Sequence, residues 1–159
     1  MNIRLVKKED LLPLAEIYKL AYNAINIGEN WDSKSALKLI QHLFDQQKDL
    51  FFVAQEKEKI IGGAVALLKP WWDGNHLSDG EIFIDPAYQE KGIGTQLIKH
   101  MFTQALKKYG VVSWDTFTHR IYDHPLNWYK KLGFEEIKSW VMITGNVEKV
   151  LKNIGNSEL

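Results

Sequence analysis

The stretch Glu81–Met101, EIFIDPAYQEKGIGTQLIKHM, determines how the rest of the chain is interpreted. It begins with four strand-like residues, Glu81–Ile84, and Pro86 then ends that strand because proline cannot donate to a β-ladder. Gly92 and Gly94 follow, and the sequence then takes up helical spacing. The first N–H groups of a helix have no internal partner, and the helix dipole favours negative charge there. The stretch therefore predicts a loop that holds a pyrophosphate, with glycines that let the backbone approach a phosphate closely.

The composition excludes several classes of protein. A length of 159 residues suits one domain with a sizeable core. Twenty basic and twenty acidic side chains cancel, which argues against a nucleic-acid partner. No apolar run approaches the roughly 20 residues needed to span a bilayer, and the N-terminus has no signal-peptide core. Without cysteine the chain has no disulfide, thiolate metal site or cysteine nucleophile, so we expect a cytoplasmic protein.

Histidine spacing gives no support for a metal site. The five histidines are scattered, and none is separated from another by the spacing of two ligands on one helix turn. His119 and His124 flank one segment, where a surface or capping role is favoured over proton transfer. We therefore expect no metal.

Hydrophobic periodicity predicts the element order β-α-α-β-β-β-α-β-α-β, followed by a short C-terminal helix. Antiparallel strands come first and a β-α-β crossover follows, which favours an α+β domain with a mixed sheet and helices on both faces. Loops are expected at 25–31 and 69–76. Strands are expected at 2–6, 50–54, 60–68, 77–84, 111–117 and 134–144, and helices at 10–24, 32–46, 92–108, 125–132 and 146–154.

Two motifs on these elements resemble one family. Gln89-x-x-Gly92-x-Gly94 resembles the Q/R-x-x-G-x-G/A signature of the GNAT family of N-acetyltransferases, between the fourth strand and the third helix. Tyr129–Phe134, YKKLGF, is similar to the Y-E-K-L-G-F of the same family, and the predicted element order matches over nearly the whole chain. The resemblance implies a single GNAT-like domain over residues 1–159, with a central, mostly antiparallel sheet splayed between strands four and five.

Other interpretations of the glycine loop are weaker. The P-loop sequence is absent, and the stretch lacks the third glycine of a dinucleotide-binding fingerprint. An alternative is that Gly92 and Gly94 only make a tight turn from strand to helix.

The resemblance implies that the chain binds acetyl-CoA. Backbone N–H groups of Glu90–Thr95 would hold the pyrophosphate, and Thr95 would add a hydroxyl. Lys91 is the cation available for the adenosine phosphates, although a solvated loop lysine is an equal alternative. The pantetheine arm would pair with the backbone of the fourth strand. The cofactor-binding set is therefore Ile82, Phe83, Ile84, Gln89, Glu90, Lys91, Gly92, Ile93, Gly94 and Thr95.

The implied reaction is direct attack of a neutral amine on the thioester in a ternary complex. An alkyl amine has a pKa near ~10.4, so a base must remove a proton at neutral pH. Glu81, at the start of the fourth strand, is the first candidate, although it could be a solvent-facing strand end. Asp79 and Asp115 are the reserves.

Tyr129 corresponds to the family tyrosine that protonates the departing thiolate, and the alternative is a tyrosine that packs its helix. The chain departs from the family seven residues earlier, where Tyr122 stands in place of an asparagine that often contacts the cofactor. The resemblance therefore says less about cofactor contacts in that segment than about Tyr129.

The acceptor site is expected from the loop between the first two helices and the loop before the fourth strand. Aromatic faces with carboxylates suit a cationic amine, although the tryptophans could instead cover the core. The substrate-binding candidates are Trp31, Glu29, Trp71 and Trp72, with Tyr22, Asp32 and Asp73 nearby in sequence.

The sequence therefore predicts an acetyl-CoA-dependent N-acetyltransferase that acts on the primary amine of a small molecule. One alternative is the same enzyme class acting on a protein or peptide amine. Another is a non-catalytic acyl-CoA-binding regulatory module, although a pure binder has no need of Tyr129. A homodimer is common in similar proteins, but no stretch of this sequence identifies an interface.

Overall fold

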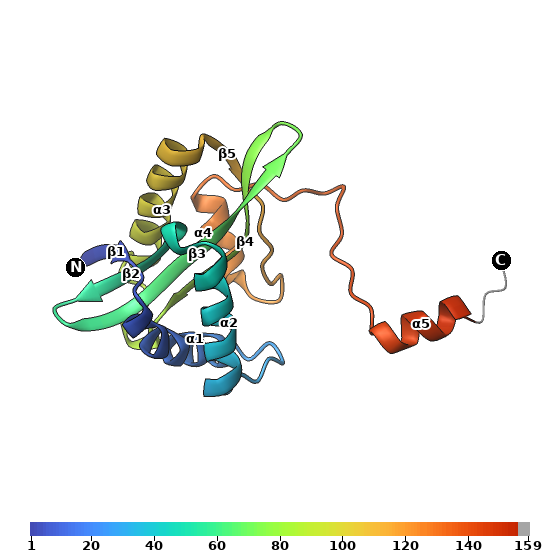
Figure 1. Ribbon diagram of the computed structural model, residues 1–159, viewed down its shortest axis with the longest axis horizontal. Coiled ribbons are helices and arrows are strands. Elements are labelled where there is room, and N and C mark those ends of the chain that lie inside the picture. Colours follow the sequence, from blue (N-terminus) through green and yellow to red (C-terminus); the bar gives the residue numbers. More distant parts are fainter. Residues whose placement is uncertain (156–159) are drawn as a thin grey trace. The chain divides into compact units, whose positions relative to one another are not determined.

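The computed structural model describes residues 1–155, which belong to two compact units, Met1–Phe117 and Thr118–Leu159. The first unit contains a five-stranded sheet and three helices, and the second contains helices α4 and α5 (Figure 1). Among the described residues, no helix is long and apolar enough to cross a membrane.

The sheet has the strand order β1-β2-β3-β4-β5, and every neighbouring pair is antiparallel except β4 and β5, which are parallel. This confirms the predicted mixed, mostly antiparallel sheet. The strands are β1 (Asn2–Leu5), β2 (Phe51–Glu56), β3 (Lys59–Trp71), β4 (Gly74–Ile84) and β5 (Val111–Trp114). The α-helices are α1 (Leu11–Ile25), α2 (Ser33–Gln46), α3 (Ile93–Tyr109), α4 (Asp123–Lys131) and α5 (Val147–Gly155), with short 3-10 turns at Lys8–Asp10, Lys48–Leu50 and Pro86–Tyr88.

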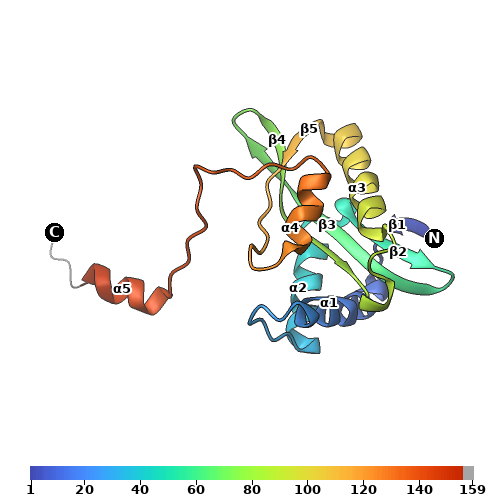
Figure 2. The same ribbon diagram turned by 180° about the vertical axis from the view of Figure 1, so that it is seen from behind.

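Helices cover both faces of the sheet. Consecutive apolar residues of β2 are buried on opposite faces, so both faces need a helix to cover them. Successive side chains of a strand point to opposite faces. Phe51 and Val53 belong to the core cluster shared with α1 and α2, whereas Phe52 contacts the ring of His100 on α3 at 4.8 Å between ring centroids. Figures 1 and 2 show α1 and α2 on one face and α3 on the other.

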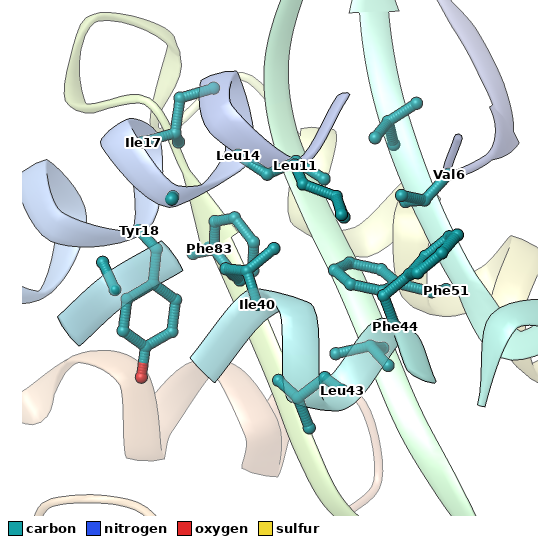
Figure 3. Packing of buried hydrophobic residues seen from close by; sticks show 14 of the residues in the cluster. Val6, Leu11, Leu14, Ile17, Tyr18, Ile40, Leu43, Phe44, Phe51 and Phe83 are labelled. Atoms are coloured by element: carbon teal, nitrogen blue, oxygen red, sulfur yellow. The ribbon is translucent and has the colours of Figure 1, made fainter. Parts of the chain in front are cut away.

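The core lies between α1, α2 and the sheet (Figure 3). Leu14 of α1 and Ile40 of α2 have no exposed surface, and Phe83 of β4 is 2% exposed. Gly63 of β3 allows this close packing, because a Cβ there would lie 2.9 Å from side-chain atoms of both Leu14 and Phe83. The burial of Phe83 on this face places Glu81, two residues earlier in the strand, on the α1 side of the sheet.

Strand β4 parts from β5 early. It pairs with β3 as far as Ile84, but with β5 only from Asn75 to Leu77. The last hydrogen bond joins the backbone N of Asp115 to the carbonyl oxygen of Leu77 at 2.8 Å. The sheet is therefore splayed between β4 and β5, as predicted.

The predicted loop at 69–76 is wrong. Strands β3 and β4 continue to Trp71 and Gly74 and are joined by a turn at Trp72 and Asp73. Cross-strand pairing holds these residues in the sheet, and the Lys69 ammonium lies 4.0 Å from the centroid of the Trp71 ring.

The predicted strand at 134–144 is also wrong. Within the described part of the second unit, the chain between α4 and α5 is irregular apart from two turns, one of them closed by a hydrogen bond from Trp140 N to Ile137 O. A strand needs a neighbour to share its backbone hydrogen bonds, and the described part of this unit contains no other strand. The apolar composition of the segment was therefore not enough to make it one.

A buried ion pair attaches β1 to the turn before α1. The Arg4 guanidinium donates to both carboxylate oxygens of Asp10 at 2.7 and 2.9 Å, and the Lys7 backbone N–H donates at 2.7 Å. The hydrogen bonds from Arg4 hold the pKa of Asp10 below its usual value, and Asp10 is only 3% exposed.

We predict that Asp10→Ala lowers the free energy of unfolding by about 2 kcal/mol, because it removes an ionised acceptor and leaves buried donors unsatisfied. Urea denaturation measures the change. Glu9→Ala is the matched control, since Glu9 forms only an exposed ion pair with Lys7 at 3.5 Å. Equal stability of the two variants would contradict the prediction.

Candidate active site

A β-bulge in β4 aims Glu81. Val65 of β3 pairs with Glu81 and Leu67 pairs with Ser78, so β4 contains one more residue than β3 between these two pairs. Asp79, within the bulge, has a left-handed φ of 45°. Bulges often redirect a side chain beside an active site.

Glu81 is a half-buried carboxyl with an unusual environment. Burial raises its pKa to about 7, and the negative charges of Glu29 and Asp79 act in the same direction. Hydrogen bonds from Tyr22 and Tyr18 lower it in part, and the Tyr22 hydroxyl donates to Oε2. The group can therefore exchange a proton near neutral pH, which is what a general base requires.

Aromatic rings from α1, the following loop and β4 pack together beside Tyr22, which donates to this carboxyl. The rings of Tyr18 and Tyr22 stack with centroids 4.2 Å apart. Tyr18 also meets Trp31 edge to face at 5.0 Å and Phe83 at 5.2 Å. Figure 3 shows the Tyr18 side chain projecting from α1 beside the core, with its hydroxyl group pointing away from Phe83.

The loop after α1 is held against the helix that precedes it. The Asn23 side chain donates to the Trp31 carbonyl and accepts from the Trp31 backbone N–H, both at 2.9 Å. The Trp31 indole donates to Glu29 at 2.6 Å, and Asp32 caps α2 by accepting from Ser35 N at 2.6 Å. The structure thus brings Glu29, Trp31 and Tyr22 to the side of the sheet that carries Glu81.

The other two acceptor candidates lie elsewhere. Trp71 and Trp72 are at the tip of the β3–β4 hairpin, and Trp72 is 86% exposed. Glu81 is seven residues along β4 from Gly74, a distance of about 23 Å at roughly 3.3 Å per residue. The structure does not bring these two tryptophans together with Glu29 and Trp31, and their role stays a prediction.

The glycine loop after β4 curls tightly into α3. Glu90 and Gly92 are left-handed, with φ of 62° and 75°. The Gln89 side chain donates to the Ile84 carbonyl at 3.1 Å, which attaches the loop to the end of β4. Helix α3 begins at Ile93 with no side-chain cap from Gly92, and the N-terminus of a helix favours an anion.

Lys91 is bound within the same loop. Its ammonium donates to the Ala87 carbonyl at 3.0 Å and lies 4.9 Å from the centroid of the Tyr88 ring. These contacts keep the cation beside the loop, but they do not test the predicted contact with a phosphate.

An unpredicted histidine clamp lies where β4 and β5 part. His76 is 6% exposed, and its Nδ1 is 2.7 Å from Asp115 Oδ2 while its Nε2 is 2.9 Å from Asp73 Oδ1. A neutral imidazole can donate from only one nitrogen, so two carboxylates favour the imidazolium. The hydrogen bond with Asp115 accordingly raises the pKa of His76. Since Asp115 is engaged here and accepts from Ser113 at 3.1 Å, it is a poor reserve base.

Tyr129 belongs to the second unit. It lies in α4, is 8% exposed, and its ring meets that of Phe134 at 5.1 Å. Its carbonyl accepts from Phe134 N at 3.1 Å, and Gly133 between them has a φ of 96°. The YKKLGF motif therefore folds back on its own tyrosine.

The comparisons with solved structures show the fold. Two structures of similar fold carry the name acetyltransferase. One is a predicted acetyltransferase from Clostridium acetobutylicum with acetyl-CoA (20% identity, TM-score 0.67, 90% of this chain and 95% of that one). The other is an aminoglycoside N-acetyltransferase in complex with CoA (22%, TM-score 0.68, 91% and 93%).

The family follows from the sequence matches. The model of the acetyltransferase (GNAT) domain matches residues 47–136. An uncharacterized N-acetyltransferase of Methanocaldococcus jannaschii is 30% identical over 92% of this chain and 67% of that protein. The chain belongs to the GNAT acetyltransferase family and is an acyltransferase, as the two motifs had indicated.

One of the contacts that were not predicted had a partial signal in the sequence. Tyr18 and Tyr22 are four residues apart and therefore share a helix face, a spacing that could have paired them. The bond between Tyr22 and Glu81 spans 59 residues and had no local signal. His76 likewise gave none, because its two partners come from different elements.

We predict that the His76 clamp makes stability depend on pH. A histidine pKa raised by folding gives stabilisation that is complete below the unfolded value of about 6.5 and is lost as pH rises through the folded value. His76→Gln should remove this loss, so wild type and variant should converge in alkaline solution. Urea denaturation across this range measures it, with the exposed His42→Gln as control. A constant difference between wild type and His76→Gln would contradict the prediction.

Proposed function

We propose that the protein transfers the acetyl group of acetyl-CoA to the primary amine of a small molecule, by direct attack in a ternary complex. The observation that carries the proposal is Glu81, a carboxyl with a pKa near 7 on the strand that parts from its neighbour. The base and the place for a thioester would then lie on the same strand.

Features of the first unit fit the shape of acetyl-CoA. Beyond Leu77 the β4 edge has no β5 partner among the described residues, so the backbone of Ile82–Ile84 can pair with the amides of a pantetheine arm. The left-handed turns before α3 and its uncapped N-terminus suit a pyrophosphate. The binding set proposed for the loop is Gln89, Glu90, Lys91, Gly92, Ile93, Gly94 and Thr95.

Glu81 acts as the base, directly or through a water molecule. The amine nitrogen forms a bond to the acetyl carbon, the carbon–sulfur bond breaks, and the amine proton passes to the Glu81 carboxylate. A carboxylate with a pKa near 7 is ionised at mildly alkaline pH and still basic enough to accept that proton.

Tyr129 acts as the acid that supplies a proton to the departing sulfur. The support for this role is its place in the YKKLGF motif, together with its burial. The phenol regains its proton from solvent after the thiol has formed.

The acceptor amine enters beside Glu29 and Trp31. A carboxylate held by an indole offers charge and an aromatic surface to an ammonium group, and the Glu29 charge already influences Glu81. Trp71 and Trp72 are retained as outer contacts for an acceptor long enough to reach the hairpin.

The proposed function also covers the domain organisation, the location and the partners of the protein. The chain functions as one acetyltransferase domain over residues 1–159, in the cytoplasm, without a nucleic-acid or membrane partner. Zero formal net charge and the lack of cysteine support this setting. A homodimer is the assembly to test by light scattering.

Thiol release from acetyl-CoA tests the function. The panel of acceptors comprises a polyamine, an amino sugar, an amino acid and a lysine-containing peptide. Release that is greatest with a small amine supports the proposal, and release with the peptide alone contradicts the small-molecule acceptor. Tight CoA binding with no amine-dependent release would make the chain a binding module.

We predict that Glu81→Gln lowers kcat about a hundredfold or more, in keeping with loss of a general base. Wild-type kcat should fall as pH drops below about 7, because the carboxyl becomes protonated, and the variant should lose this dependence. Glu58→Gln, in the exposed turn between β2 and β3, is the control and should retain wild-type rates. Wild-type activity in Glu81→Gln would exclude this base.

We predict that Tyr129→Phe lowers kcat at least tenfold, which corresponds to about 1.4 kcal/mol of barrier. The ring keeps its packing against Phe134, so far-ultraviolet circular dichroism should be unchanged. Tyr122→Phe in the same unit serves as the control, since Tyr122 is 44% exposed. Full activity of Tyr129→Phe would remove the acid role.

A further inference from the structure

Two phenols on consecutive turns of α1 converge on Glu81. Tyr22 donates its hydroxyl hydrogen to Glu81 Oε2, and the Tyr18 hydroxyl acts with it to lower the pKa of the same carboxyl. The two rings stack at 4.2 Å with an angle of 24° between their planes. Residues four apart lie one above the other on a helix, so this geometry follows from their positions in α1.

The core fixes the inner phenol of this pair. Tyr18 is 2% exposed, and its ring is held edge to face by Trp31 and Phe83 at 5.0 and 5.2 Å. Tyr22 stacks on Tyr18 and is only half-buried. The order of contacts is therefore core, Tyr18, Tyr22 and then Glu81, which gives the carboxyl a rigid support.

We propose that Tyr22, supported by Tyr18, is a positioning residue that holds the Glu81 carboxylate in place for acetyl transfer. This inference rests on the proposed role of Glu81 as base. Tyr22 keeps its own proton during the reaction, because it only donates a hydrogen bond to Glu81 and takes no part in the proton transfer. An ionised carboxylate has about four lone-pair positions, so two phenols leave others to accept the amine proton.

The charges around Glu81 explain why such support is needed. From the loop after α1, Glu29 opposes its ionisation, and from β4 itself Asp79 does the same. Among residues 1–155 no lysine or arginine forms an ion pair with Glu81. Tyr18 and Tyr22 thus supply the hydrogen bonds that favour the ionised form and limit the rise in its pKa.

A packing role alone would not need the hydroxyl. Phenylalanine at position 22 would keep the stack with Tyr18 and lose the hydroxyl that donates to Glu81. Tyr109→Phe is a matched control, because the Tyr109 hydroxyl donates to the carboxylate of Asp49 in the same way, at the far end of α3.

The first experiment needs no substrate. The carboxyl carbons of glutamate are labelled with carbon-13, and the Glu81 signal is assigned from its absence in Glu81→Gln. We expect Tyr22→Phe to raise the titration midpoint of Glu81 by half a pH unit or more, and Tyr109→Phe to leave it unchanged. An unmoved midpoint in Tyr22→Phe overturns the proposal.

The second experiment measures kcat against pH at saturating concentrations of acetyl-CoA and of the fastest amine from the panel. In Tyr22→Phe the acidic limb should move to higher pH with the midpoint, and kcat near neutral pH should fall at least threefold. The KM for acetyl-CoA should stay within twofold of wild type. A rise in the KM for acetyl-CoA or a loss of stability, without movement of the limb, would indicate a structural role and overturn the proposal.

The two experiments separate the two hypotheses. Full activity in Glu81→Gln removes the base, and the positioning role fails with it. An inactive Glu81→Gln beside a Tyr22→Phe variant with wild-type midpoint and limb contradicts the role of Tyr22 alone. Tyr18→Phe provides a second variant if Tyr22→Phe does not fold, and it should shift the Glu81 midpoint in the same direction.

Discussion

Within residues 1–155, strand β4 beyond Leu77 has a strand neighbour on one side only, because β3 follows it to Ile84 while β5 does not. Backbone N–H and C=O groups seldom remain unsatisfied in a protein interior, so the open edge needs a partner from outside the sheet. The bulge at Asp79 lies on the same stretch and turns Glu81 toward α1. One strand therefore combines an edge that can bind an extended ligand with the candidate base.

Three carboxyl groups of this protein have different roles because their surroundings differ. Asp10 is paired with Arg4 and has a lowered pKa, which makes it a structural anion. Asp115 is committed to His76 and holds the hairpin end of β4 near the end of β5. Glu81 is hydrogen bonded to phenols instead of cations, and burial raises its pKa to about 7. A carboxyl group that is paired with a cation therefore stays ionised, whereas a buried carboxyl group without a cationic partner can exchange a proton near neutral pH.

Much of the fold could be predicted because its signals are local. The helical spacing of α1, α2 and α3, and the alternation of β2, depend on near neighbours in sequence. The segment at 134–144 shows the limit, since its apolar residues read as a strand while pairing depends on a neighbour that sequence does not specify. The site divides in the same way. Glu81 and the glycine loop could be found from their order along the chain, whereas the Tyr22 and His76 contacts join residues far apart and could not.

Gly80 connects these observations to how the protein can vary. A Cβ at this position would lie 2.5 to 2.8 Å from three atoms of the Trp114 indole, a rigid group that is 7% exposed. The space that a side chain would take is already filled by the ring of Trp114, which is the β5 residue of the last β4–β5 pair. Gly80 directly precedes the candidate base Glu81, and any side chain at this position would collide with Trp114. We therefore expect Gly80 to tolerate little substitution. In a survey of sequence tolerance such a position would be mistaken for a catalytic one, although its contribution is only to leave room.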